Sequence, residues 1–410
     1  MNDNANRPAG GLSRRRLLRH AAAGSLLLPM PFIARGALAE ETFRVGWIRP
    51  TTGRLASSFA PLYAGGLIAI DEINAAGGIL GRKVVTVEED DEASPAKQPA
   101  VIKRLKDAGV SYVVGPTGSP QVLSSLAFTT PAQMIQCGIA NAADQGDAAK
   151  YPYNYMCVWS TEQEGEAAAA YMANQLKIRK IGLLQESTPF GEQAGNATKR
   201  KFKELTGQDP ASVQVYPATA TDLAPYVKNL QAAGCEGVIV WMANTVHIGM
   251  AFNAMAQQKW LPPVIGHVNL FNDALFDLVP LEALQNVYGI YYKNWTYTGS
   301  EQVPPRNMEL ARKLATVETA KGIQAFVAGC PHYDFLYLLK TAVEQAKSTD
   351  VAAVKKALDG IRGYKAVLGT INFSETSHAG IGMEDVTLAS VASAKDPRSF
   401  GAIRERAPGA

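Results

Sequence analysis

Cysteines and the motifs of common catalytic sites are scarce in this chain. It has four cysteines among 410 residues, and no two of them form a Cys-x-x-Cys pair. That spacing gives no support to a zinc site or a thioredoxin-like redox motif. The sequence also lacks a His-Glu-x-x-His, a Gly-x-Ser-x-Gly and a Gly-x-x-x-x-Gly-Lys-Ser/Thr motif. We therefore expect a binding protein without a metal or cofactor, and not an enzyme.

The other residues with chemical potential have ordinary structural explanations. The acidic run from Glu88 to Glu92 comes at the expected end of a strand, which is typical of a solvated turn and not of a glycosidase acid pair. The histidines lack the spacing of metal ligands. Each cysteine lies in or beside an apolar run, so a buried thiol and a disulfide remain alternatives for Cys137, Cys157, Cys235 and Cys330.

Residues 1–39 have the three parts of an export signal. The basic segment Ser13–Arg19 precedes an uncharged stretch from Ala21 to Ile33, and Ala37-Leu38-Ala39 follows as a small-x-small cleavage site. Paired arginines before the apolar stretch indicate the twin-arginine route. A membrane anchor is the alternative, but the stretch is short of the ~20 apolar residues that a spanning helix needs. We predict cleavage after Ala39 and a periplasmic mature protein.

The remaining chain has little net charge. Residues 1–39 contain six of the 40 basic and one of the 37 acidic side chains, so that 34 basic and 36 acidic side chains remain. Nucleic acid and anionic membranes require a basic surface, which this balance does not provide. We expect neither as a partner, and we expect a monomer.

Short β-rich runs alternate with amphipathic segments from residue 42 onward, which predicts parallel strands joined by helices. The expected elements include strands at Phe43–Ile48 and Lys83–Glu88 and a helix over 163–177. The alternation restarts after a stretch rich in Tyr, Pro and Asn between Lys150 and Tyr155. About 370 residues exceed what one hydrophobic core serves, so two lobes are expected. The predicted division is lobe 1 from residues 40–159 and 291–368, lobe 2 from 160–290 and 369–400, and a disordered tail at 401–410.

One strand-loop-helix segment has the features of an anion site. The expected strand Val110–Val114 leads into Gly115-Pro116-Thr117-Gly118-Ser119-Pro120, with Ser119 expected as the helix N-cap and Pro120 as the first helical residue. Backbone N–H groups and the helix dipole at such a start favour a carboxylate. The alternative is that Ser119 only caps its helix. The loops 51–58 and 140–143 should meet this segment at the same sheet edge.

Several segments resemble those of the leucine/isoleucine/valine-binding proteins. They are Phe43-Arg44-Val45-Gly46, the run Asp71-Glu72-Ile73-Asn74-Ala75-Ala76-Gly77-Gly78-Ile79-Leu80-Gly81-Arg82, and Glu89-Asp90-Asp91 with the later Gly-Pro turn. The resemblance covers about residues 42–395. It implies a type I periplasmic-binding fold of the α/β class, in which a three-strand hinge joins two doubly wound parallel-sheet lobes. It also implies that the lobes close on a ligand and present it to an ABC permease.

The resemblance also implies a set of ligand-binding positions. A hydroxyl residue after the Gly-Pro turn and the backbone after the next strand hold the ligand carboxylate in that family. One family aromatic falls on Ser58, a second is retained as Phe190, and a third falls on Asn244. The predicted ligand-binding residues are Ser57, Ser58, Ser119, Ala140, Asn141, Ala142, Phe190, Asn244, His267 and Asn269.

The family's acid for an α-ammonium group would fall near Val268 or Asn269, and neither is acidic. A buried ammonium without a carboxylate costs several kcal/mol. The sequence therefore favours a small carboxylate, with an aromatic or amide-bearing body, over a plain α-amino acid. Glu186 in place of the missing acid is the alternative. A ligand-sensing regulator of the same fold and an exported hydrolase are the competing functions.

Overall fold

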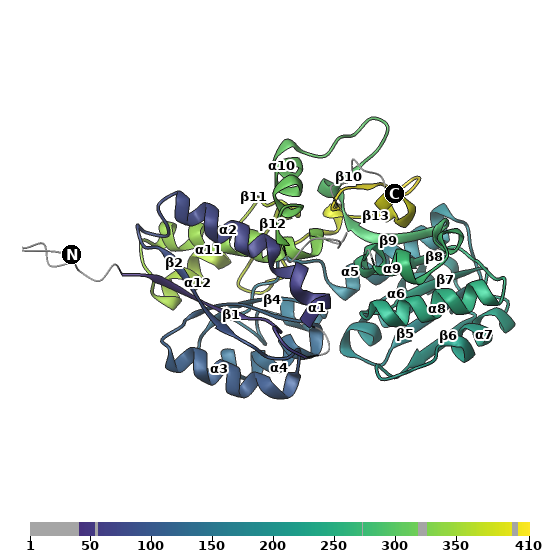
Figure 1. Ribbon diagram of the computed structural model, residues 1–410, viewed down its shortest axis with the longest axis horizontal. Helices are drawn as coiled ribbons and strands as arrows, with labels where there is room; N and C mark the ends of the chain where they lie inside the picture. Colours follow the sequence, from purple (N-terminus) through teal and green to yellow (C-terminus); the bar gives the residue numbers. More distant parts are fainter. Residues whose placement is uncertain (1–40, 54–55, 273, 319–325, 396–400) are drawn as a thin grey trace, which may run out of the picture. The chain divides into compact units, whose positions relative to one another are not determined.

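The computed structural model describes residues 41–53, 56–272, 274–318, 326–395 and 401–410 (Figure 1). The predicted signal peptide and its cleavage site lie outside these residues. Residues 41–410 form one unit by their internal contacts. None of the described helices has the length and apolar character that a membrane crossing requires.

The first sheet has four strands in the order β2-β1-β3-β4, and all of its pairings are parallel. Its strands are β1 (Phe43–Ile48), β2 (Val84–Glu89), β3 (Tyr112–Thr117) and β4 (Ile135–Ile139). Its connecting helices are α1 (Ala56–Phe59), α2 (Ala64–Ala75), α3 (Gln98–Asp107) and α4 (Ser119–Thr129). Every residue of β3 and β4 is buried, which fits strands covered on both faces.

Three later helices return to this first sheet. They are α10 (Pro305–Leu314), α11 (Cys330–Ala346) and α12 (Val351–Asp359). Helix α11 packs along α2, α12 packs on α11, and α10 contacts α2. Figure 1 shows α2, α11 and α12 on one face of the sheet, with α3 and α4 on the other. The first lobe is thus built from two separate parts of the chain.

The second sheet has the order β13-β9-β8-β7-β5-β6, and only β13 runs antiparallel to its neighbour. Its strands are β5 (Ile181–Glu186), β6 (Ser212–Tyr216), β7 (Gly237–Trp241), β8 (Val264–Gly266), β9 (Val287–Tyr292) and β13 (Val386–Ser390). Its helices are α5 (Thr161–Ala170), α6 (Pro189–Thr206), α7 (Ala224–Ala232), α8 (Thr245–Gln257) and α9 (Ala274–Leu278).

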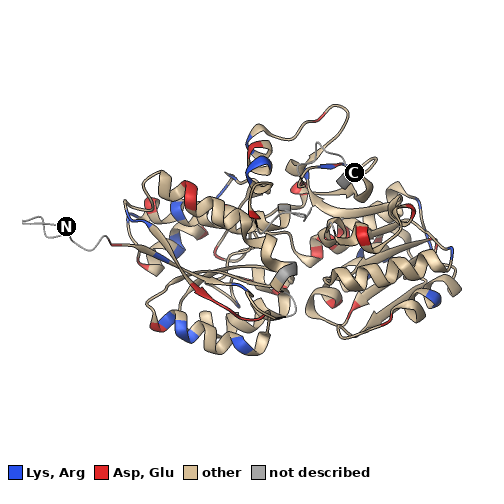
Figure 2. Cartoon of the chain, viewed as in Figure 1, with Lys and Arg blue, Asp and Glu red and all other residues tan. Residues whose placement is uncertain are grey.

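The chain passes between the two sheets three times. The connections run from β4 to α5, from β9 to α10, and from the short strand β12 (Thr370–Ile371) to β13. Strand β12 pairs with β11 (Tyr364–Lys365). The predicted α/β class with two mostly parallel sheets is confirmed. Figure 2 shows basic and acidic residues distributed over the elements of both sheets.

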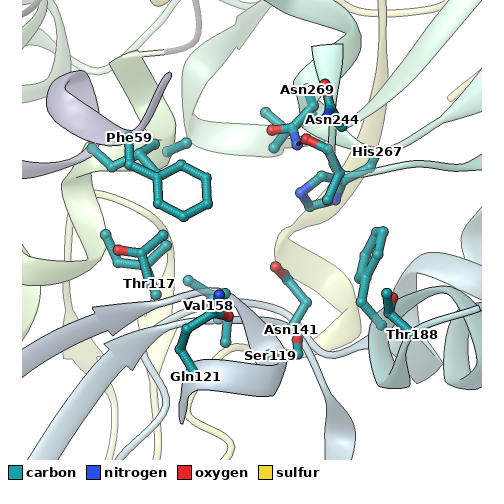
Figure 3. A pocket seen from close by; sticks show the side chains of 18 of the residues that line it. Phe59, Thr117, Ser119, Gln121, Asn141, Val158, Thr188, Asn244, His267 and Asn269 are labelled. Carbon is teal, nitrogen blue, oxygen red and sulfur yellow. Dashed lines mark hydrogen bonds between the residues drawn. The ribbon is translucent and has the colours of Figure 1, made fainter. Parts of the chain in front are cut away.

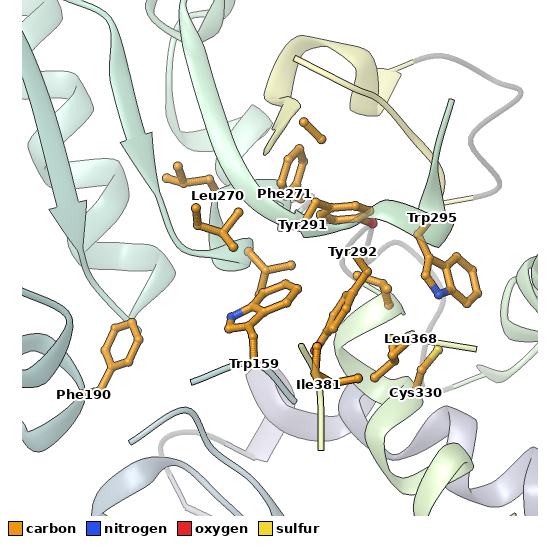
Figure 4. Packing of buried hydrophobic residues seen from close by; sticks show 14 of the residues in the cluster. Trp159, Phe190, Leu270, Phe271, Tyr291, Tyr292, Trp295, Cys330, Leu368 and Ile381 are labelled. Atoms are coloured by element: carbon orange, nitrogen blue, oxygen red, sulfur yellow. The ribbon is translucent and has the colours of Figure 1, made fainter. Parts of the chain in front are cut away.

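Aromatic side chains pack where the connections meet the second sheet (Figure 4). Trp159 and Tyr292 pack at a tilt of 36° with ring centroids 3.9 Å apart, and Phe271 meets Tyr291 edge-on at 4.8 Å. Trp159 is 1% exposed and Tyr292 2%. Such close-packed aromatic pairs stabilise a specific geometry beyond the apolar area they bury. The four cysteines are also buried, and none of them forms a disulfide in the described part of the chain.

The sequence-based prediction for the end of the chain is wrong. The tail 401–410 was predicted to be disordered, but β14 (Arg404–Glu405) pairs with β10 (Thr296–Tyr297) and Arg404 is wholly buried. The guanidinium of Arg404 lies 5.2 Å from the Phe271 ring, and three apolar tail residues are buried with it. The helix predicted over 163–177 is present, as α5 up to Ala170 and then as a π-helical turn over Tyr171–Gln175.

Candidate ligand-binding site

A cavity of about 270 Å³ lies at the carboxyl ends of the strands of both sheets. This is where open α/β sheets bind ligands, and the volume approaches the lower end of the usual range for small-molecule sites. We call the residues Phe59, Thr117, Ser119, Gln121, Ala140 and Asn141 the first-sheet wall. We call Glu186, Thr188, Phe190, Asn244, His267 and Asn269 the second-sheet wall (Figure 3).

The Gly-Pro turn after β3 requires its glycine. Gly115 has a φ of 88°, and a Cβ there would lie 2.0 Å from the carbonyl oxygen of Ile48. An L side chain is therefore excluded by both backbone conformation and space. This close approach of β1 and β3 brings the start of α4 to the cavity.

Ser119 does not cap its own helix. Helix α4 begins at Ser119, Gly118 occupies the N-cap position, and no side chain caps the helix. The Ser119 hydroxyl oxygen instead accepts a hydrogen bond of 3.1 Å from the backbone N–H of Ala142, which follows β4. The predicted N-cap role is thus wrong, and the hydroxyl hydrogen can be donated towards the cavity.

The loop after β4 supplies a second polar group. Asn141 donates its Nδ2 hydrogen to the Trp159 carbonyl oxygen at 2.9 Å, and its side chain lies at the cavity in Figure 3. The amide oxygen of Asn141 is thereby turned into an acceptor for the cavity. Ala140 lines the cavity, whereas Ala142 lies behind it and orients Ser119.

Phe59 is a wall residue that the sequence analysis missed. The predicted residues Ser57 and Ser58 fall in α1, and their side chains lie outside the described part of the chain. The next residue, Phe59, lines the cavity, and its ring points into it in Figure 3. The first sheet therefore supplies an aromatic wall residue one position after the serine on which the family aromatic was expected to fall.

Phe190 supplies the aromatic surface of the second-sheet wall. It lies in the first turn of α6, where Thr188 is the N-cap. A Cβ on the following glycine, Gly191, would lie 2.2 Å from the Glu186 carbonyl oxygen, so α6 starts close against β5. The Phe190 ring meets Trp241 edge-on at 6.4 Å. Trp241 itself is fully buried behind it and does not line the cavity.

The two asparagines of the second-sheet wall are held by backbone groups. Asn244 is the N-cap of α8, and its Oδ1 accepts from the N–H of Val246 at 2.8 Å. Asn269 donates its Nδ2 hydrogen to the Ala243 carbonyl oxygen at 2.8 Å. Asn244 therefore offers its amide hydrogens to the cavity, and Asn269 its amide oxygen.

Charged side chains are few at this site. Glu186 is the one acidic residue among the described residues that line the cavity, and none of these is Lys or Arg. Its Oε1 accepts from the Thr188 hydroxyl at 2.7 Å, and its Oε2 accepts from the Ala243 N–H at 2.9 Å. Protein donors thus already engage both oxygens of this carboxylate.

His267 is backed by a carboxylate that the sequence analysis did not identify. Its Nδ1 lies 2.5 Å from Oε1 of Glu164, which also accepts from the indole N–H of Trp159. Glu164 lies in the first turns of α5 and is completely buried. Burial also raises the pKa of the neighbouring Tyr292 well above its ordinary value. Nothing in the sequence distinguishes Glu164 from the exposed acids of the same helix.

The sequence and the fold are similar to those of known binding proteins. The model of the family described as periplasmic binding protein matches residues 42–396. "Leu/Ile/Val-binding protein homolog 1" of Brucella suis biovar 1 (strain 1330) is 26% identical over 352 residues, which cover 84% of this chain and 89% of that protein.

Two solved structures illustrate the shared fold. A branched-chain amino acid transporter substrate binding protein from Streptococcus pneumoniae, in complex with isoleucine, has a TM-score of 0.74 at 19% identity and covers 85% of this chain and 96% of its own. A solute binding protein of an ABC transporter from Rhodopseudomonas palustris BisB5, in complex with 3,4-dihydroxy benzoic acid, has a TM-score of 0.70 at 18% identity, covering 85% and 93%. With the two parallel sheets and the cavity at their strand ends, these findings show that the chain belongs to the periplasmic binding protein family and has its type I fold.

Proposed function

We propose that the protein is the periplasmic substrate-binding component of an ABC importer, and that its ligand is a small carboxylate with an aromatic or amide-bearing body. The observation that carries the proposal is the composition of the cavity wall. A helix start and a hydroxyl face the cavity on one side, aromatic rings face it on both sides, and its one acid is already hydrogen-bonded.

The carboxylate is proposed to bind at the start of α4. The first turn of a helix has backbone N–H groups without partners inside the helix, and the dipole adds positive potential there. Ser119 adds a hydroxyl hydrogen, because its oxygen is already occupied as the acceptor for Ala142. Such a site holds an anion without a Lys or Arg side chain.

The body of the ligand is proposed to lie between Phe59 and Phe190, with Asn244 and Asn269 as polar partners. Burial of apolar ligand surface against such rings provides affinity, and the amides provide orientation. The bound 3,4-dihydroxy benzoic acid of the Rhodopseudomonas palustris protein is a ligand of the same chemical kind.

An α-amino acid is the alternative ligand, and Glu186 is the observation that favours it. Lone pairs of its carboxylate oxygens remain for an ammonium group beyond the bonds from Thr188 and Ala243. The relatives named as Leu/Ile/Val-binding proteins are consistent with this alternative.

Isothermal titration distinguishes the proposed carboxylate from the alternative α-amino acid. The mature protein is titrated with branched-chain amino acids and with aromatic and aliphatic monocarboxylates. We expect one or more of the acids to bind, and leucine, isoleucine and valine to bind weakly or not at all. Tight binding of the amino acids without the acids would overturn the carboxylate assignment. Mass spectrometry of the molecule that co-purifies from the native host provides an independent identification.

Export and closure are further parts of the proposal. We propose that the signal peptide is removed after Ala39, with lobes made of residues 40–159 with 291–368 and 160–290 with 369–400. Ligand binding would close the lobes for recognition by the permease. The hydrogen bond of 2.7 Å from the Ala143 N–H to Gln193 on α6 supports such interlobe contacts. A mature protein that begins at residue 40 by mass spectrometry would support the cleavage site.

A further inference from the structure

Glu164 is a buried carboxylate with few partners. It is 0% exposed, and its described side-chain partners are the Trp159 indole N–H and Nδ1 of His267, both at Oε1. Its other oxygen, Oε2, is buried and has no hydrogen-bond partner among the described residues. A buried carboxylate of this kind is tolerated when a cation neutralises it. His267 is the group in contact that can supply that positive charge.

A second buried histidine-carboxylate pair shows what is different about this one. His378 contacts Oδ1 of Asp359 through Nε2 at 2.9 Å and the carbonyl oxygen of Asn154 through Nδ1 at 2.8 Å. Both of its nitrogens are thus occupied by the protein, away from the cavity. His267 has a described partner on Nδ1 alone, and its ring lines the cavity. The second nitrogen of His267 is thus left for something that enters the cavity.

The position of the His267 ring is fixed on several sides. It meets Phe190 edge-on at 5.0 Å and Trp159 at 6.5 Å, and Glu164 fixes which nitrogen faces inward. A carboxylate on Nδ1 requires the proton there. Nε2 then accepts a hydrogen bond in the neutral ring and donates one in the imidazolium. Figure 3 places this ring across the cavity from Ser119 and Gln121.

We propose that Glu164 holds His267 as the imidazolium, and that His267 determines specificity by donating its Nε2 hydrogen to a second oxygen acceptor on the ligand, at the end opposite the carboxylate. The ligand class is then a small carboxylate that also carries a hydroxyl, carbonyl or second carboxylate oxygen. The same imidazolium disfavours a ligand with an ammonium group at that end, because like charges repel. This inference rests on the proposed carboxylate site and specifies the other end of the same ligand.

The test compares matched acids that differ only in the second oxygen. The probes are 4-hydroxybenzoate against benzoate and 4-hydroxyphenylacetate against phenylacetate, titrated into the full mature protein. We expect the hydroxylated acid of at least one pair to bind about tenfold more tightly, as a hydrogen bond from a charged donor predicts. His267→Leu should reduce that ratio to about one, and Glu164→Gln should reduce it in part.

Controls separate a specific role from a structural one. His267→Gln keeps a donor and should retain part of the ratio, whereas a merely structural role would weaken both acids of a pair by the same factor. His378→Leu removes an imidazole from the other buried pair and should leave the ratio unchanged. Thermal unfolding shows which variants fold. If the variants do not fold, the ratio of the wild-type affinities for the two acids of each pair decides whether the second oxygen is recognised.

The outcomes distinguish this inference from the proposed function. If no acid binds to the wild type, the carboxylate site itself is wrong, and this inference falls with it. If the acids bind with equal affinity within each pair, or with a ratio that His267→Leu leaves intact, only the role of His267 is overturned.

Discussion

The two walls of the cavity differ in their chemistry. The first-sheet wall has no ionisable side chain among its named residues and offers a hydroxyl, an amide and a helix start. The second-sheet wall contains Glu186 and His267, and the buried Glu164 lies behind the histidine. Both walls also supply one phenylalanine, Phe59 and Phe190.

From this difference we propose a division of roles between the walls. Backbone groups at a helix start bind a carboxylate by a geometry that many sequences reach, so the first-sheet wall provides the general part of recognition. Side chains with alternative partners and charges discriminate between ligands, so the second-sheet wall provides the selective part. Substitutions in the first-sheet wall should therefore weaken the binding of every ligand. Substitutions in the second-sheet wall should change the rank order of the ligand affinities.

The largest expected effect concerns the glycines that bring each helix start to the cavity. Gly115→Ala and Gly191→Ala place a Cβ 2.0 and 2.2 Å from backbone oxygens of Ile48 and Glu186. We expect each to cost more than about 4 kcal/mol of unfolding free energy, or to prevent folding. Urea unfolding monitored by circular dichroism measures the loss.

Two other glycines provide the control for this experiment. Gly109 and Gly207 have φ values of 73°, but a Cβ on either would meet nothing within 4 Å. Their alanine variants should lose only about 1 kcal/mol of unfolding free energy, because only the left-handed backbone conformation is strained. Equal losses in all four variants would mean that close approach to the strands does not matter.

Acid should destabilise the protein through the buried His332, which lies behind the first-sheet wall. Burial lowers the pKa of His332 from 6.5 to about 3, and its ring stacks on Tyr63 behind the first-sheet wall. Because the unfolded chain takes up this proton more readily, the contribution of His332 to stability is present above pH 6.5 and is lost as pH falls towards 3. Between about pH 6.5 and about pH 4 the loss should reach about 3 kcal/mol.

The variant His332→Phe keeps a ring but removes the titration. Its unfolding free energy should fall less on acidification than that of the wild type, and the difference between the two isolates His332 from the carboxylates that also titrate. Burial raises the pKa of Asp334 to about 7, so protonation of Asp334 on acidification stabilises the fold. This opposite effect is the same in the wild type and in the variant. Parallel pH profiles would contradict the assignment.

Ser119→Ala tests the first-sheet wall directly. Loss of its hydroxyl should weaken carboxylate binding by about 1–3 kcal/mol, by a similar factor for every acid that binds. Ser124→Ala is the matched control, since Ser124 lies on the same helix with its hydroxyl donated to Pro95 on the exposed surface. Unchanged affinity in Ser119→Ala would show that the Ser119 hydroxyl does not bind the ligand and only accepts the hydrogen bond from Ala142.

The smallest expected effect compares the two aromatic rings. Phe59→Ala and Phe190→Ala should each weaken binding by about 1 kcal/mol if the ligand body lies between them. Phe128→Ala, on the exposed end of α4, serves as the control. A loss confined to one of the two cavity variants would show that the body rests on one wall only, and titration calorimetry measures it.

Much of the architecture follows from local patterns in the sequence. The predicted strand Phe43–Ile48 has the observed bounds of β1, and the predicted strand at 83–88 is displaced by one residue. Such agreement arises because buried parallel strands are continuous apolar runs between turn residues. The prediction for residues 401–410 failed because so short a segment shows no periodicity. Its apolar residues Ala402, Ile403 and Ala407 are nevertheless buried.

The site was less accessible to sequence reasoning. Ser119 and Asn141 follow strand ends, and this position in an α/β unit identified them, whereas Phe190 was identified through the family resemblance. Trp159 comes from the connection between β4 and α5, and Tyr292 is the last residue of β9, where the chain leaves the second sheet; no local rule indicates a cavity wall at either position. Glu164 looks like any helix acid until the packing of α5 brings it to His267, which is a long-range property.

The most direct test of the central claim is a titration of the wild-type protein with each acid that binds and with the primary amide of the same acid. The amide has nearly the same shape but no negative charge, so the start of α4 should reject it. We predict an affinity at least about tenfold lower for the amide than for the acid. Equal binding of acid and amide would contradict a carboxylate held at Ser119.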